Sequence, residues 1–145
     1  MDNLIKCLNE YLSDLKVFAC KLQNYHWNVE GKEFFQMHEK LEEYYNSTNR
    51  DIDEIAESIL MLGGQPVGTL KDFIEFAKIS EAKNEKVNQK VIFEVLIQDF
   101  NTLLEKVIKI KEESDKNNVY LISTLMDDAI SGYSKKLWML NQSNR

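Results

Sequence analysis

Two histidines and two carboxylates are the side chains of this sequence best suited to bind a metal ion. His26 and His38 are its only histidines, and they lie on either side of Gly31, which predicts a turn. Asp53 and Glu57 are four residues apart, so on a helix both carboxylates extend from one face. Like charges at that spacing repel each other unless a cation lies between them. Imidazole and carboxylate ligands without thiolate suit iron, zinc or manganese, and an open coordination position on iron would allow redox chemistry.

The spacing along the chain limits how these four side chains can meet. On one continuous helix, His38 and Asp53 would be about 22 Å apart along the axis, too far for a single metal ion to bridge. Suppose instead that two copies of the helix pack antiparallel about a two-fold axis near residues 45–46. His38 of one chain then lies beside Asp53 and Glu57 of the other, and the symmetry creates two identical sites per dimer. The Glu-x-x-His motif of an ordinary di-iron bundle does not occur in the sequence.

The composition favours long helices as the elements that position these residues. The chain has 145 residues, a length typical of one hydrophobic core, and we expect residues 1–145 to form a single domain. Apolar residues make up 43% of the chain and charged residues 29%, which is enough apolar material for a packed core. One proline and five glycines are too few for the many turns of a β-rich domain.

Hydrophobic periodicity divides the chain into four long segments. In each segment, apolar residues recur at alternating steps of three and four, which is typical of a bundle helix. The segments run over residues 4–25, 34–62, 91–110 and 122–140. The second ends at the Gly63-Gly64 pair, and the third ends at the Asn and Asp residues of 115–118, which favour a turn.

The connection between the second and third segments contains a further helical signal. Thr69 can cap a short helix over residues 70–77, and the charged run from Glu81 to Lys90 is expected to resume a long helical pattern. Two tightly joined helix pairs separated by about 20 residues describe a four-helix bundle with one long crossover. The predicted fold is therefore all-α and ferritin-like, with a short extra helix in the crossover between the second and third helices.

The net charge indicates which partners the chain can bind, and the lack of targeting signals and the two cysteines indicate its cellular compartment. Eighteen basic and 24 acidic residues give a formal charge of −6, the wrong sign for a chain that mainly binds nucleic acid or an anionic bilayer. Neither a leader pattern nor an apolar stretch of membrane-spanning length is evident, so we expect a cytoplasmic protein. Cys7 and Cys20 would face different sides of a helix, and both are expected to be reduced, inert packing residues.

The region around the first histidine resembles the signature of the Dps mini-ferritins, the DNA-protection-during-starvation family. Residues 24–31 read Asn-Tyr-His-Trp-Asn-Val-Glu-Gly, a second histidine follows at position 38, and residues 53–57 read Asp-Glu-Ile-Ala-Glu. The resemblance extends over nearly the whole chain. It implies a hollow dodecamer with ferroxidase centres at its two-fold dimer interfaces, where His26 and His38 would come from one subunit and Asp53 and Glu57 from its mate.

The same resemblance implies a reaction and two further site residues. The reaction is oxidation of Fe(II) to Fe(III), with hydrogen peroxide preferred over dioxygen, followed by mineral growth in the cavity. Glu42 stands where the family often has a carboxylate that assists the second, weaker iron, although a plain surface role is equally compatible with the sequence. Trp27 matches a family tryptophan near the centre, where an oxidisable ring could absorb a stray one-electron oxidant. Zinc is a conceivable surrogate for iron, since imidazole and carboxylate ligands accept it.

The chain departs from the family pattern at its termini. Members often bind DNA through a tail rich in lysine and arginine, whereas residues 1–15 here contain only Lys6 and the residues after Trp138 contain only Arg145. Because phosphate neutralisation supplies most of such affinity, we expect DNA binding to be weak or absent. The alternative to a ferroxidase is an oligomeric structural or DNA-compacting bundle without significant iron oxidation.

A second departure concerns the pores of the implied cage. The segment where many members place pore aspartates contains Asn117 and Asn118 instead. Asp115, Asp127 and Asp128 could serve in their place, but paired acidic residues of this kind are more often solvated or used to cap a helix.

Overall fold

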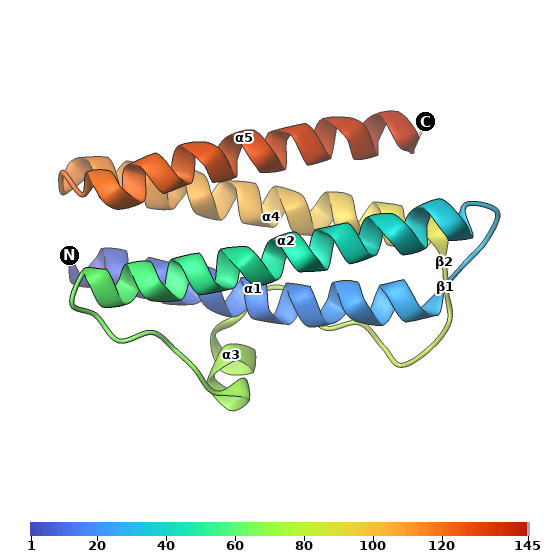
Figure 1. Ribbon diagram of the computed structural model, residues 1–145, viewed down its shortest axis with the longest axis horizontal. Helices are drawn as coiled ribbons and strands as arrows, with labels where there is room; N and C mark the ends of the chain where they lie inside the picture. The colour runs from blue at the N-terminus through green and yellow to red at the C-terminus, as the bar shows by residue number, and fades with distance from the viewer. Residues whose placement is uncertain (145) are drawn as a thin grey trace.

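The computed structural model describes residues 1–144 and contains four long helices and one short one (Figure 1). The helices are α1 (Asp2–Asn28), α2 (Phe34–Met61), α3 (Leu70–Phe76), α4 (Gln89–Lys116) and α5 (Tyr120–Ser143). The tight pairs α1–α2 and α4–α5 lie side by side, and α3 lies in the crossover beside α1. The predicted all-α four-helix bundle with a short crossover helix is confirmed.

The core forms where the apolar stripes of the four long helices meet. In α1 the stripe is completely buried at Leu8, Leu15 and Phe18, and in α4 at Leu96 and Leu103. An aromatic contact joins the two pairs, because Phe18 meets the Phe100 ring edge to face at 5.1 Å. The predicted stripe is correct except at its margins: Phe34, the first apolar residue of the second predicted segment, is 36% exposed because it occupies the first position of α2.

The crossover agrees with the predicted cap and differs from the predicted charged helix. The Thr69 hydroxyl accepts a hydrogen bond from the Asp72 backbone N–H at 3.2 Å, and Phe73 is the residue of α3 that is buried. The expectation that residues 81–90 resume a helix is wrong, because α4 begins only at Gln89, where the side chain of Asn88 caps it. The charged residues have no apolar stripe to hold them against the bundle, so they form an exposed loop.

A short pair of strands, which the sequence did not predict, fastens the turn between α1 and α2. β1 (Val29–Glu30) pairs in parallel with β2 (Val87–Asn88), directly before α4. At Gly31 φ is +135°, and a Cβ there would lie 2.6 Å from Gln89 Oε1, so only glycine fits without strain. That oxygen accepts the Glu33 backbone N–H at 2.5 Å. The turn that separates the two histidines is thus held against the start of α4.

The two cysteines have different surroundings. Cys7 is buried and Cys20 is exposed, so the expectation of a packing role is correct for Cys7 and wrong for Cys20. The helical spacing that turns them to different faces is the physical reason. Over residues 1–144, no helix is both long enough and apolar enough to cross a membrane. Arg145, the basic residue noted at the C-terminus, lies outside the described residues.

Candidate metal centre

The two histidines meet across the α1–α2 turn and orient each other. Their rings stack with centroids 3.7 Å apart and planes 12° from parallel. His26 Nδ1 donates a hydrogen bond to the His38 backbone carbonyl at 2.6 Å, and His38 Nδ1 donates one to the His26 backbone carbonyl at 2.8 Å. The turn anchored by Gly31 and Gln89 is the local reason that two residues from different helices come this close.

These reciprocal hydrogen bonds determine which nitrogen of each ring can bind a metal. A carbonyl oxygen can only accept, so each Nδ1 must carry the proton. In the neutral imidazole the lone pair then resides on Nε2, the nitrogen left free for a ligand bond. A backbone carbonyl on the opposite nitrogen is the support that metal-binding histidines ordinarily have. Each ring is therefore prepared to bind a metal through its Nε2 atom.

Aromatic residues surround the histidine pair. Phe34 stacks on the His38 ring at 5.2 Å, and Tyr45 meets the His26 ring edge to face at 5.5 Å. His26 is itself buried, whereas its neighbour Trp27 is 62% exposed on the outer side of α1. Tyr45 falls on the apolar stripe of the second predicted segment, residues 34–62. Its place two turns after His38, on the same face of α2, is the signal that could have linked it to the site.

The carboxylates lie far from the histidines of the same chain. Asp53 and Glu57 are both exposed on α2, which continues without a break from Phe34 to Met61. With a rise of about 1.5 Å per residue, His38 and Asp53 are separated by about 22 Å along this helix. Within residues 1–144, no three histidine, cysteine, aspartate or glutamate side chains come together as a metal-binding group. One chain thus presents two separate halves of the four-residue set.

Glu42 is the carboxylate nearest to the histidines along the helix, one turn after His38. It is exposed, and one of its oxygens accepts a hydrogen bond from the Tyr45 hydroxyl at 3.3 Å. Because the Tyr45 ring also contacts His26, the tyrosine connects Glu42 to the histidine pair. The arrangement is compatible with an auxiliary ligand at Glu42.

The interior of the bundle is occupied by tyrosines. The buried hydroxyls of Tyr11 and Tyr133 are 2.7 Å apart, and they line a cavity of about 190 Å³ together with Asp51 and Glu54. Burial raises the pKa of Asp51 to about 6 and also raises the pKa of both tyrosines. An ordinary di-iron bundle would place its glutamates and histidines in this interior. Both histidines of this chain lie instead at the end of the bundle.

The aspartates considered for a pore have partners within the chain. Lys111 pairs with Asp127 at 2.9 Å and with Asp115 at 3.8 Å, while the Ser123 hydroxyl donates a hydrogen bond to Asp115 at 2.5 Å. Asp128 is exposed and lines the mouth of the tyrosine cavity. Local ion pairing between α4 and α5 accounts for Asp115 and Asp127 without a pore.

Comparison with known proteins identifies the family of the chain. Residues 5–143 match the ferritin-like domain family. The chain is 36% identical over 137 residues to "DNA protection during starvation protein 2" of Bacillus anthracis, covering 94% of this chain and 93% of that protein. The Dps of Staphylococcus aureus superposes with a TM-score of 0.96 at 30% identity, covering 100% of this chain and 97% of that one. The Dps of Vibrio cholerae is described as a member of a broad superfamily of ferritin-like diiron-carboxylate proteins. It superposes with a TM-score of 0.95 at 33% identity, covering 99% of this chain and 90% of that one. The chain therefore belongs to the Dps family of ferritin-like proteins.

Proposed function

We propose that the chain is an iron-storing and iron-detoxifying ferroxidase whose centres are shared between two chains of a dodecameric cage. The observation that carries this proposal is the stacked histidine pair, whose two Nδ1 atoms are engaged by backbone carbonyls. Among residues 1–144, Asp53 and Glu57 of the same chain lie too far along α2 to complete the site, and no three potential ligands come together. Antiparallel pairing of two α2 helices supplies Asp53 and Glu57 from the mate. The isologous symmetry then gives two equal centres per dimer.

The neutral histidines and the charged carboxylates are proposed to have different roles at the centre. Neutral His26 and His38 bind Fe(II), and the carboxylates Asp53 and Glu57 offset the charge that grows when iron is oxidised. Glu42 is proposed to assist the second iron. Trp27, exposed beside His26, is proposed to reduce stray one-electron oxidants before they reach other molecules. Zinc is expected to compete for the same ligands.

The proposed reaction uses hydrogen peroxide in preference to dioxygen. Two Fe(II) ions each give one electron to one peroxide molecule, its O–O bond breaks, and two protons complete two water molecules. Two Fe(III) ions remain and hydrolyse to the stored mineral. Because both electrons are taken from a pair of irons, no hydroxyl radical is released. Such a role places the protein in the cytoplasm, where it protects the cell from peroxide.

The first experiment measures iron oxidation directly. Fe(II) is added to the assembled protein without oxygen, peroxide follows, and ferric absorbance is recorded for wild type, His26→Ala and Asp53→Ala. Both variants are expected to oxidise iron much more slowly than wild type. Glu105→Ala, an exposed carboxylate on α4, is the matched control and should behave as wild type. If all the variants oxidise iron at the wild-type rate, the site assignment is wrong.

A mixing experiment tests whether the centre is shared between chains. His38→Ala and Asp53→Ala proteins are unfolded, mixed in equal amounts and reassembled. Each mixed dimer then contains one centre without mutated ligands and one that lacks both, so random pairing restores about a quarter of the centres. A site built within one chain would give no recovery. Size-exclusion mass separates the expected dodecamer from a dimer.

The competing function is a structural or DNA-compacting bundle. The name of the Bacillus anthracis relative refers to DNA protection, but this chain has an acidic balance and few basic residues near either terminus. We propose that it protects through iron and peroxide chemistry and binds DNA weakly or not at all. A gel shift at low salt should show little retardation. Strong retardation combined with normal iron oxidation would correct the DNA statement and leave the ferroxidase proposal intact.

A further inference from the structure

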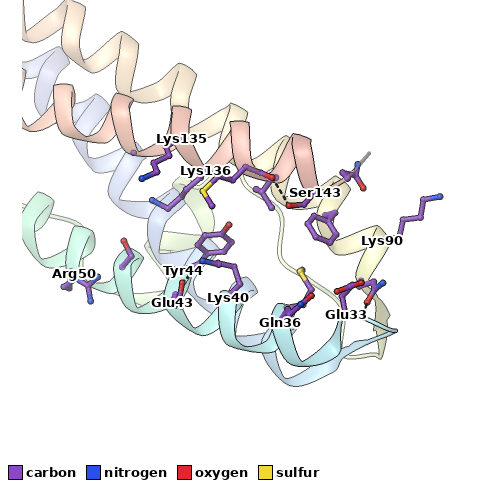
Figure 2. A pocket seen from close by; sticks show the side chains of 18 residues that line it. Glu33, Gln36, Lys40, Glu43, Tyr44, Arg50, Lys90, Lys135, Lys136 and Ser143 are labelled. Carbon is purple, nitrogen blue, oxygen red and sulfur yellow. Dashed lines mark hydrogen bonds and ion pairs between the residues drawn. The ribbon is translucent and has the colours of Figure 1, made fainter.

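A groove of about 880 Å³ runs between α2 and α5, and the first residues of α4 also line it (Figure 2). It lies on the opposite face of α2 from the candidate metal centre. The α2 positions that line it, such as Gln36, Lys40 and Ser47, are about half a helical turn away from His38 and Tyr45. The groove is thus separate from the ferroxidase ligands.

The charge of the groove is opposite to that of the chain. Five cationic side chains line it against two carboxylates, whereas the whole chain has a formal charge of −6. The cations are Lys40, Arg50, Lys90, Lys135 and Lys136, and the carboxylates are Glu33 and Glu43. In Figure 2, Lys90 and Arg50 stand at opposite ends of the groove, and Lys136 extends from α5 toward the α2 side.

Of the two lysines at the centre of the groove, Lys40 has a carboxylate partner and Lys136 has none among residues 1–144. Lys40 pairs with Glu43 at 2.8 Å, but among residues 1–144 no carboxylate oxygen lies within 4 Å of the Lys136 ammonium. Burial lowers the pKa of Lys136, and the charge of Lys40 across the groove lowers it further, while Asp51 opposes both effects. An anion placed between the two lysines would remove this repulsion.

The floor of the groove is apolar. Met37, Tyr44 and Leu140 are buried beneath it, Phe93 is half-buried, and Met139 is 45% exposed along its wall. A simple inorganic anion would bind the lysines and leave this apolar surface exposed to water. A ligand with an acidic group and an apolar body would use both parts.

From this combination we propose that the α2–α5 groove binds a small amphipathic organic anion. Its acidic group lies between Lys40 and Lys136, and its aromatic or aliphatic body lies on Met37, Phe93 and Met139. The proposal does not depend on iron chemistry, because the groove shares no residue with the metal centre.

The test uses the aryl sulfonate dye 8-anilinonaphthalene-1-sulfonate on the assembled protein and follows its fluorescence. Wild type is expected to bind one dye per chain saturably. The Lys40→Gln/Lys136→Gln protein should bind it about tenfold more weakly, which corresponds to about 1.4 kcal/mol. Lys83→Gln/Lys116→Gln, which removes two exposed lysines outside the groove, is the control with the same change of net charge. Equal binding by both double variants would overturn the proposal.

Further measurements test whether the apolar surface of the groove contributes to binding, and whether the groove acts independently of iron oxidation. Met139→Gln retains the side-chain length and should also weaken dye binding. Octanoate should displace the dye at concentrations where inorganic phosphate does not, and equal displacement by phosphate would overturn the amphipathic assignment. Iron oxidation by Lys40→Gln/Lys136→Gln should equal that of wild type. Dye binding therefore tests the groove proposal, and iron oxidation tests the ferroxidase proposal independently.

Discussion

His26 and His38 hold each other in place: their rings stack at 3.7 Å, and each Nδ1 donates to the backbone carbonyl of the other residue. The contact fixes both the orientation and the tautomer of the two rings before a metal arrives. It also ties the end of α1 to the beginning of α2. The proposed chemistry and the local stability therefore involve the same pair of residues.

Replacing His38 by alanine separates these two roles. The variant loses one hydrogen bond and the ring contacts with His26 and Phe34, so we expect thermal unfolding to show a loss of about 1–2 kcal/mol. Anaerobic titration with Fe(II) should show at least about 10- to 100-fold weaker binding. Glu39→Ala, at the next and exposed position of α2, should change neither quantity. Lost stability with unchanged Fe(II) affinity would make the histidine pair structural only.

Tyr45→Phe tests whether Glu42 contributes to iron binding. The substitution retains the ring beside His26 and removes the hydroxyl that donates to Glu42 at 3.3 Å. Because this hydrogen bond is exposed, we expect a stability change below about 0.5 kcal/mol. Binding of the second Fe(II) should weaken, and the first should remain near wild type. If Glu42→Gln and Tyr45→Phe both bind two irons normally, Glu42 is an ordinary surface residue.

Asp51 should make stability depend on pH. Its pKa is raised from 3.8 to about 6, chiefly by burial, so the folded chain holds this proton more tightly than the unfolded chain does. The contribution of Asp51 to stability is therefore greatest below about pH 4 and is lost as the pH rises to about 6. Asp51→Asn should remove that dependence and stabilise the protein at pH 7 by about 1–2 kcal/mol, since the carboxylate is partly solvated.

The check on Asp51 is urea unfolding of wild type and variant at pH 4.5 and pH 7. The difference between the two proteins should grow from the lower to the higher pH. A constant difference for Asp51→Asn would exclude it as the titrating group.

The ion pair between Lys21 and Asp99 should matter far more than the surface pairs. Lys21 Nζ lies 2.7 Å from Asp99 Oδ2, and both side chains are buried. Lys21→Ala therefore leaves the Asp99 carboxylate in the core without a positive partner. We expect a loss of about 3–5 kcal/mol in chemical denaturation, against about 1 kcal/mol or less for Lys111→Ala. The double variant Lys21→Met/Asp99→Leu should recover most of the loss. Equal effects of Lys21→Ala and Lys111→Ala would contradict this prediction.

The helices could be predicted because their signals are local and repeated. The stripe from Leu4 to Leu22 recurs every three or four residues, and the Thr69 cap requires only residues three positions away. The strand pair of residues 29–30 and 87–88 could not be predicted, since two residues carry no period and their partners are nearly 60 positions apart. The charged run before Gln89 was misassigned because helix propensity without an apolar stripe does not hold a segment against a core.

By itself the sequence determined the four-helix layout, the turn that brings two histidines together, and a second helix too long for His38 and Asp53 of one chain to meet. These follow from residue type and from the fixed rise of a helix. Only the tertiary structure decided that the histidine rings stack with both Nδ1 atoms engaged, that Tyr45 joins Glu42 to them, and that a basic groove opens on the opposite face of α2. Those relationships join atoms on different helices, and their distances depend on how the helices pack.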